Sequence, residues 1–119
     1  MASSMGERFL MGEIIPPIFI VEDLDVGVYA SIHDVERHLE PIDIRNQEYV
    51  AYDAVGKLLR LGINGNRVTV LPDEHKPSHA SKLKKTLCDF LKAIKKPVTD
   101  DQKRKLSLLV EACKEFIVH

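Results

Sequence analysis

Histidines and cysteines are the residues of this 119-residue chain best suited to metal or nucleophilic chemistry. His33 and His38 stand five positions apart in a segment with helical periodicity, so their side chains point in different directions and do not suit one metal ion. His75 and His79 have the spacing of a helical metal pair, but Pro77 between them is incompatible with that helix. The spacing therefore predicts no metal site and no cofactor.

The two cysteines, Cys88 and Cys113, are the candidate nucleophiles. Each lies on an apolar stripe, where a free cysteine usually behaves as a small buried hydrophobe with an inert thiol. No histidine or acidic residue completes a catalytic signature around them, and the chain has no G-x-S-x-G motif and no glycine-rich phosphate loop. The sequence therefore predicts a protein that is not an enzyme, and two thiols without a disulfide framework favour a reducing compartment.

Acidic residues dominate the first part of the chain. Residues 1–77 carry 13 Asp and Glu residues against 7 Lys and Arg residues, a net charge of −6. These carboxylates fall in expected turns and in one short helix, where together they present a negative surface to a basic partner. The residues that we predict to bind this partner are Asp23, Asp25, Glu36, Glu40 and Asp43.

Basic residues dominate the rest. Residues 78–119 carry 10 Lys and Arg residues against 5 Asp and Glu residues, a net charge of +5. Most lie on the expected C-terminal helices: Lys82, Lys84, Lys85, Lys92, Lys95, Lys96, Lys103, Arg104 and Lys105. Because only one of these is an arginine and no aromatic residue is interleaved for base stacking, solvated helix faces are the favoured interpretation. A nucleic-acid-binding or regulatory module that uses these helices stays open as the alternative.

The elements that must position these side chains follow a short leader. Residues 1–12 lack periodicity and predict a flexible leader, which leaves residues 13–119 as a single domain. Residues 18–21 and 26–29 have strand composition and flank an acidic turn over residues 22–25. No apolar run approaches the ~20 residues of a membrane-spanning helix, so no membrane association is expected.

Turn chemistry divides the middle of the chain. Ser31, followed by Asp34, predicts the start of a short helix that Pro41 ends. The turn at residues 53–56, which ends on a glycine, and the Asn-Gly turn at residues 64–66 separate three further strands. They form a meander.

Two apolar stripes predict the C-terminal helices. The first helix begins after Pro77 and stops at Pro97. Thr99 and Gln102 form a capping box that begins the second helix, whose apolar stripe extends through Ile117. The fold class is therefore α+β, an antiparallel sheet of about five strands with one short helix after strand two and a C-terminal antiparallel helix pair packed on one face. The predicted core is Phe19, Val21, Val35, Leu39, Val50, Leu59, Val70, Leu87, Leu91, Leu109, Val110 and Phe116.

A series of motifs in the first half of the chain resembles a known class of protein. They are the strand–turn–strand run Val21-Glu22-Asp23 to Tyr29, the Ser31 helix start, Leu39-Glu40-Pro41-Ile42-Asp43, and the hairpin from Glu48 to Leu59. Over residues 18–62 the chain is similar to small bacterial immunity proteins encoded beside polymorphic toxins of the contact-dependent inhibition or Rhs type. The resemblance implies a cytoplasmic, non-enzymatic inhibitor, without catalytic residues, that binds a cognate toxin domain. An acidic surface would suit a nuclease toxin, whose substrate channel is basic.

Overall fold

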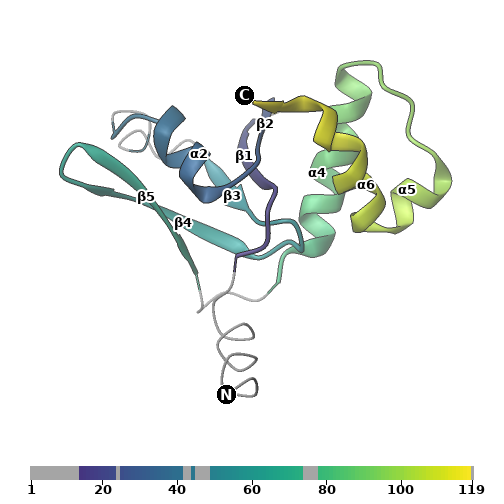
Figure 1. Cartoon of the computed structure of the whole chain (residues 1–119). Coiled ribbons are helices and arrows are strands. Elements are labelled where there is room, and N and C mark those ends of the chain that lie inside the picture. Colours follow the sequence, from purple (N-terminus) through teal and green to yellow (C-terminus); the bar gives the residue numbers. More distant parts are fainter. Residues whose placement is uncertain (1–13, 24, 42–43, 45–48, 74–77, 119) are drawn as a thin grey trace.

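The computed structural model describes residues 14–23, 25–41, 44, 49–73 and 78–118. The predicted leader, residues 1–12, therefore lies outside the described residues. The described residues form an α+β fold around one curled sheet (Figure 1). The strands are β1 (Ile18–Glu22), β2 (Asp25–Tyr29), β3 (Val50–Tyr52), β4 (Leu58–Asn64), β5 (Arg67–Pro72) and β6 (Ile117–Val118). The helices are α2 (Ile32–His38), α4 (Ala80–Ala93), α5 (Asp100–Arg104) and α6 (Leu106–Cys113), followed by the 3₁₀ turn η1 (Lys114–Phe116).

The sheet is mixed, with six strands in the order β5-β4-β3-β1-β2-β6, so the prediction of about five antiparallel strands is wrong. The first five strands pair antiparallel, but β6 runs parallel to β2, with Val28 opposite Ile117 and Tyr29 opposite Val118. The apolar stripe of the last helix was expected to extend through Ile117. Instead, η1 ends the helix and the β-branched pair Ile117-Val118 extends the sheet.

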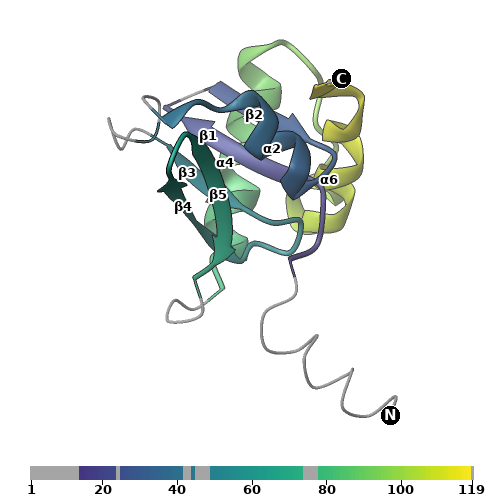
Figure 2. The same cartoon turned by 60° about the vertical axis from the view of Figure 1, so that its left-hand side comes forward.

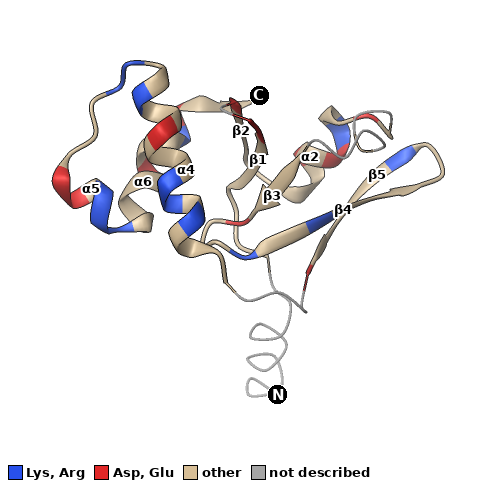
Figure 3. Ribbon diagram, turned by 180° about the vertical axis from the view of Figure 1, so that it is seen from behind, with Lys and Arg blue, Asp and Glu red and all other residues tan. Residues whose placement is uncertain are grey.

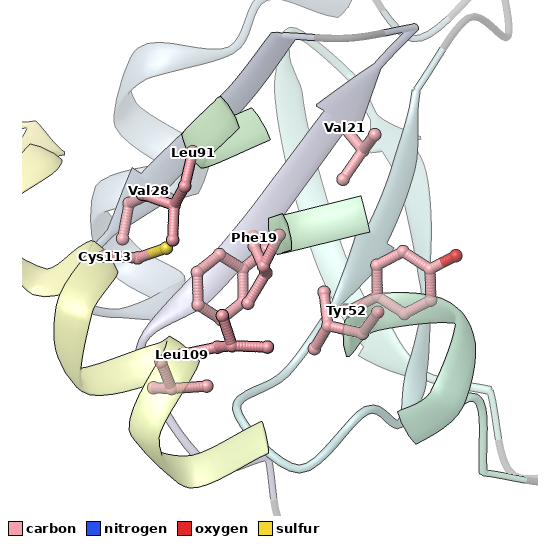
Figure 4. Close-up of a cluster of buried hydrophobic side chains, with 10 residues drawn as sticks. Phe19, Val21, Val28, Tyr52, Leu91, Leu109 and Cys113 are labelled. Atoms are coloured by element: carbon pink, nitrogen blue, oxygen red, sulfur yellow. The ribbon is translucent and has the colours of Figure 1, made fainter. Parts of the chain in front are cut away.

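Helices cover both faces of the sheet. Figure 1 shows α4, α5 and α6 to the right of the central strands and α2 to their left. Along β1, Phe19 and Val21 pack against the C-terminal helices (Figure 4), while Ile18 and Ile20 pack in the cluster that includes Val35 of α2. Successive residues of β1 are therefore buried on opposite faces, as in sheets with helices on both sides.

Most of the predicted core is confirmed. The buried members are Phe19, Val21, Val35, Leu59, Val70, Leu87, Leu91, Leu109 and Val110. Leu39 and Phe116 are half-buried, and the prediction for Val50 is wrong, because 41% of its surface is exposed. Its neighbours Ala51 and Tyr52 are buried in its place, one in each of the two core clusters.

The second C-terminal helix begins as predicted but does not continue as one helix. The Thr99 hydroxyl accepts from the Gln102 N–H at 3.1 Å and the Gln102 side chain accepts from the Thr99 N–H at 2.9 Å, which confirms the capping box. Lys105 is extended, with φ −118° and ψ 115°, and separates α5 from α6. Residues 100–104 carry no apolar side chain to pack on α4, and the packed stripe begins only at Leu106.

Candidate partner-binding surface

The tight turn between β1 and β2 carries the first two of the predicted binding residues. Glu22 pairs with Asp25, so the loop contains only two residues, and Asp23 has a φ of +53°. The predicted acidic turn is therefore present. Its local cause is the left-handed conformation, which aspartate adopts more readily than most residues besides glycine, and not, among the described residues, a carboxylate bonded to the backbone.

Both turn carboxylates are available to solvent. Asp23 and Asp25 are exposed, and within the described part of the chain neither side chain makes a hydrogen bond or an ion pair. The register also places Glu22 directly opposite Asp25, and like charges in this position oppose strand pairing. Three carboxylates in four residues therefore make this end of the sheet locally negative despite that cost.

Glu40 lies just after α2, at the end from which the chain continues toward β3. It is exposed and follows α2, and the chain then leads to β3, whose first residue, Val50, pairs with Val21 next to the β1–β2 turn. Figure 2 shows α2 lying across the sheet alongside β1 and β2. Asp43 lies outside the described residues. We call Asp23, Asp25 and Glu40 the acidic end of the sheet.

Glu36 has a different role from the acidic end. Its Oε2 atom accepts the Val70 N–H of β5 at 3.0 Å. Asp73 donates its N–H to the Leu58 carbonyl of β4. Because backbone N–H groups alternate in direction along a strand, the backbone nitrogens of Val70 and Pro72 point away from β4, toward the open edge of the sheet. Glu36 satisfies the N–H group at the first of these positions and proline has no N–H group at the second, so neither position is open to pairing with another strand.

The Glu36 bond predicts a measurable stability effect. We expect Glu36→Ala to lower the free energy of unfolding by about 1–2 kcal/mol, because the half-buried Val70 N–H loses a charged acceptor. Glu36→Gln keeps an acceptor oxygen and should lose less than half as much. Urea unfolding of the two variants measures the difference, and equal losses would show that the bond is not the cause.

A cleft next to this bond holds charges of both signs. It has a volume of about 440 Å³ and lies between α2 and the β4–β5 hairpin, with Glu36, Arg37 and Arg67 among its lining residues. Arg37 also approaches Asp34, at 3.9 Å. This cleft was not anticipated from the sequence because its two arginines come from elements that are distant along the chain. Its mixed charge favours neither an anion nor a cation.

Positive charge lies mainly on the C-terminal helices, away from the acidic end (Figure 3). Part of it is neutralised, because Lys96 pairs with Glu115 at 3.1 Å and Lys114 pairs with Glu111 at 2.9 Å. The lysines of these helices and the acidic end therefore come from different elements, although both signs of charge also occur on α2 and on the helices.

The described candidate catalytic and metal-binding residues come from several elements, and His75 lies outside the described residues. Among the described residues no three His, Cys, Asp or Glu side chains gather to hold a metal ion. Burial, with smaller contributions from Cys88 and Glu115, raises the pKa of the Cys113 thiol to about 12, so this thiol is protonated at neutral pH. The Nδ1 atom of His38 lies 2.8 Å from the backbone oxygen of Asp34.

Asp53 is the one fully buried charged residue in the described part of the chain, and sequence reasoning treated it as part of a turn. Its carboxylate accepts three backbone N–H groups, from Ile15, Val55 and Lys57. All of its described contacts are to backbone donors that it organises, so its role is structural.

Comparison with protein families, with curated proteins and with solved structures found no match for this chain. Within the described ranges, no helix combines the length and the apolar character needed to cross a bilayer.

Proposed function

We propose that this protein is a cytoplasmic, non-enzymatic immunity or inhibitor protein that binds and neutralises a cognate bacterial toxin domain. The proposal rests on one observation, the pair of exposed carboxylates of Asp23 and Asp25 on a two-residue turn at the acidic end of the sheet. Together with Glu40 they offer a negative surface to a basic partner.

The turn is well suited to binding because its supporting strand is rigid. β1 is one of the two central strands of the described sheet, paired on both sides, and its residues Ile18 to Val21 are buried. A charged turn fixed in this way loses little conformational entropy when a partner binds. Its field also accelerates the encounter with an oppositely charged partner.

The partner that this charge favours is a basic protein surface. A nuclease toxin binds phosphates with lysines and arginines in its substrate channel. Carboxylates on a protruding turn compete for the same cations, so inhibition needs no catalytic group on this chain. The proposed partner is therefore a basic toxin domain, with a nuclease as the preferred type.

The test removes charge without disturbing the turn. We expect the triple variant Asp23→Asn/Asp25→Asn/Glu40→Gln to associate with the cognate toxin domain at least about tenfold more slowly at low salt. Asparagine at position 23 tolerates the same positive φ, so folding is retained. The difference from the wild-type rate should shrink as salt screens the charges, and stopped-flow kinetics at several ionic strengths measures it.

The matched control is Asp100→Asn/Asp101→Asn/Glu111→Gln, which changes net charge equally on exposed residues of α5 and α6. It should leave the association rate within about twofold of wild type. If the control slows association as much as the test variant does, net charge rather than the acidic end is responsible. If only substitutions at Lys84, Lys85, Lys92 and Lys95 abolish binding, the proposed surface is wrong.

A further inference from the structure

A groove along α4 is not used by the proposed function. This groove has a volume of about 450 Å³ and lies along α4, facing Lys103 of α5. Four lysines and a single carboxylate line it: Lys84, Lys85, Lys92, Lys103 and Asp89. We call it the lysine groove.

The single carboxylate of the lysine groove is already engaged. Lys85 Nζ donates to Asp89 Oδ2 at 2.8 Å, and this hydrogen bond raises the pKa of the Lys85 ammonium group. Lys84 Nζ donates to the backbone carbonyl of Arg104 at 3.1 Å, a neutral partner that leaves its charge uncompensated. Lys92 and Lys103 make no ion pair within the described residues. Three positive charges therefore face the groove without a counter-charge.

The walls of the lysine groove are held in place by bonds already described. The Thr99 capping box fixes the start of α5, and the Lys84 bond fixes its last residue against α4. The opposite side of α4 is anchored in the core by Leu83, Leu87 and Leu91. One wall of the groove is therefore a helix packed in the core, and the other, α5, is joined to it by the Lys84–Arg104 hydrogen bond.

We propose that the lysine groove binds an acidic segment of a protein partner. Lys84 and Lys92 are eight residues apart, about 12 Å along the helix. An extended peptide rises about 3.3 Å per residue, so carboxylates three or four residues apart span this distance. Each ammonium group acts as a point charge and accepts a carboxylate from many directions, which suits acidic side chains that are not held rigidly.

A peptide fits the groove better than a nucleic acid does. No arginine lines it to form a two-pronged bond with a phosphate, and no aromatic side chain lines it to stack on a base. The groove lies on the helices and takes an anion, whereas the proposed immunity function uses carboxylates on the sheet and takes a basic partner. The two sites are therefore testable independently.

The test uses a fluorescein-labelled twelve-residue peptide with Glu at every third position and a labelled twelve-nucleotide oligothymidylate. Fluorescence anisotropy should show that wild-type protein binds the peptide at about 50 mM salt, and that binding weakens as salt increases. We expect Lys92→Glu/Lys103→Glu to weaken peptide binding at least about tenfold. The Asp23→Asn/Asp25→Asn/Glu40→Gln variant should bind the peptide at least as well as wild type does.

The matched control is Lys82→Glu/Lys105→Glu, which makes the same charge change at exposed positions that do not line the groove. It should retain peptide binding within about threefold. Equal weakening by both variants, or no peptide binding by wild type at low salt, would overturn the proposal. Tighter binding of the oligothymidylate, lost in Lys92→Glu/Lys103→Glu, would assign the groove to nucleic acid. Lys92→Gln/Lys103→Gln replaces the reversal if that variant does not fold.

Discussion

Replacing Asp53 with alanine is expected to lower the free energy of unfolding by about 3–5 kcal/mol. Its Oδ2 atom accepts the Ile15 N–H at 3.1 Å, and its Oδ1 atom accepts the Val55 and Lys57 N–H groups at 3.0 and 2.9 Å. The residue is 0% exposed, so water does not replace the lost acceptor without rearrangement. Three donors would therefore lose their partner, and each costs about 1–3 kcal/mol when buried and unsatisfied. Urea unfolding measures the loss.

Two variants test this explanation. Asp53→Asn keeps one acceptor oxygen but turns an amide N–H group toward a backbone donor, so we expect a smaller loss, about 2 kcal/mol. Asp25→Ala removes an exposed carboxylate and should change stability by less than about 0.5 kcal/mol. A loss below about 1 kcal/mol for Asp53→Ala would show that the turn rearranges and satisfies its donors without the carboxylate.

The Asp53 carboxylate also connects stability to the proposed binding surface. It ties Ile15, just before β1, to the turn that follows β3, and the opposite end of β1 leads into Asp23. The acidic end depends on a strand that this bond helps to place. An Asp53→Asn protein that remains folded should still bind the proposed partner, because the β1–β2 turn is held by its own register.

Turns and caps were the parts of the fold that the sequence predicted best. The two-residue turn at Asp23, the Thr99 capping box and the hairpin at Gly65 all follow from interactions within a few residues. Such preferences are local, so they act in the same way whatever the rest of the chain does. The predicted change from sheet to helices after Pro77 holds for α4, α5 and α6 but not for β6, which returns to the sheet.

Local preferences did not predict which strand residues face solvent, and they did not predict the last strand. A strand with one solvent-exposed face alternates apolar and polar residues, but β1 is buried on both faces and Val50-Ala51-Tyr52 is apolar throughout. Nothing local shows that Val50 rather than its neighbours faces solvent. Strand β6 follows a helical stripe, and only its pairing with β2, far away in sequence, makes it a strand.

The candidate sites depended even more on distant contacts. Glu36 looked like one exposed carboxylate among several, and its bond to Val70 spans 34 positions. The lysines of α4 and α5 looked like solvated helix faces, and the groove combines Lys103 of α5 with lysines of α4, a separate helix. The exposed turn carboxylates, in contrast, were identified correctly as exposed because a tight turn dictates its own geometry.

The second large stability effect is expected at Gly56. This glycine has a φ of +87°, and its carbonyl accepts the His79 N–H at 2.7 Å just before α4 begins. A Cβ atom here would lie 2.5 Å from the Ala80 Cα atom and 2.7 Å from its nitrogen. Gly56→Ala should therefore lower the free energy of unfolding by about 3 kcal/mol or more. The left-handed conformation accounts for about 1–2 kcal/mol of this loss, and the displacement of α4 accounts for the rest. Urea unfolding monitored by circular dichroism measures it.

Gly65 supplies the matched control for this prediction. Its φ of +64° also lies in the left-handed region, but a Cβ atom there would meet no atom within 4 Å. Gly65→Ala should therefore cost only about 1 kcal/mol, the conformational part alone. The difference between the two variants isolates the contact between the turn and α4. Equal losses would mean that α4 moves away from the turn at no cost, and that the turn does not hold the helix in place.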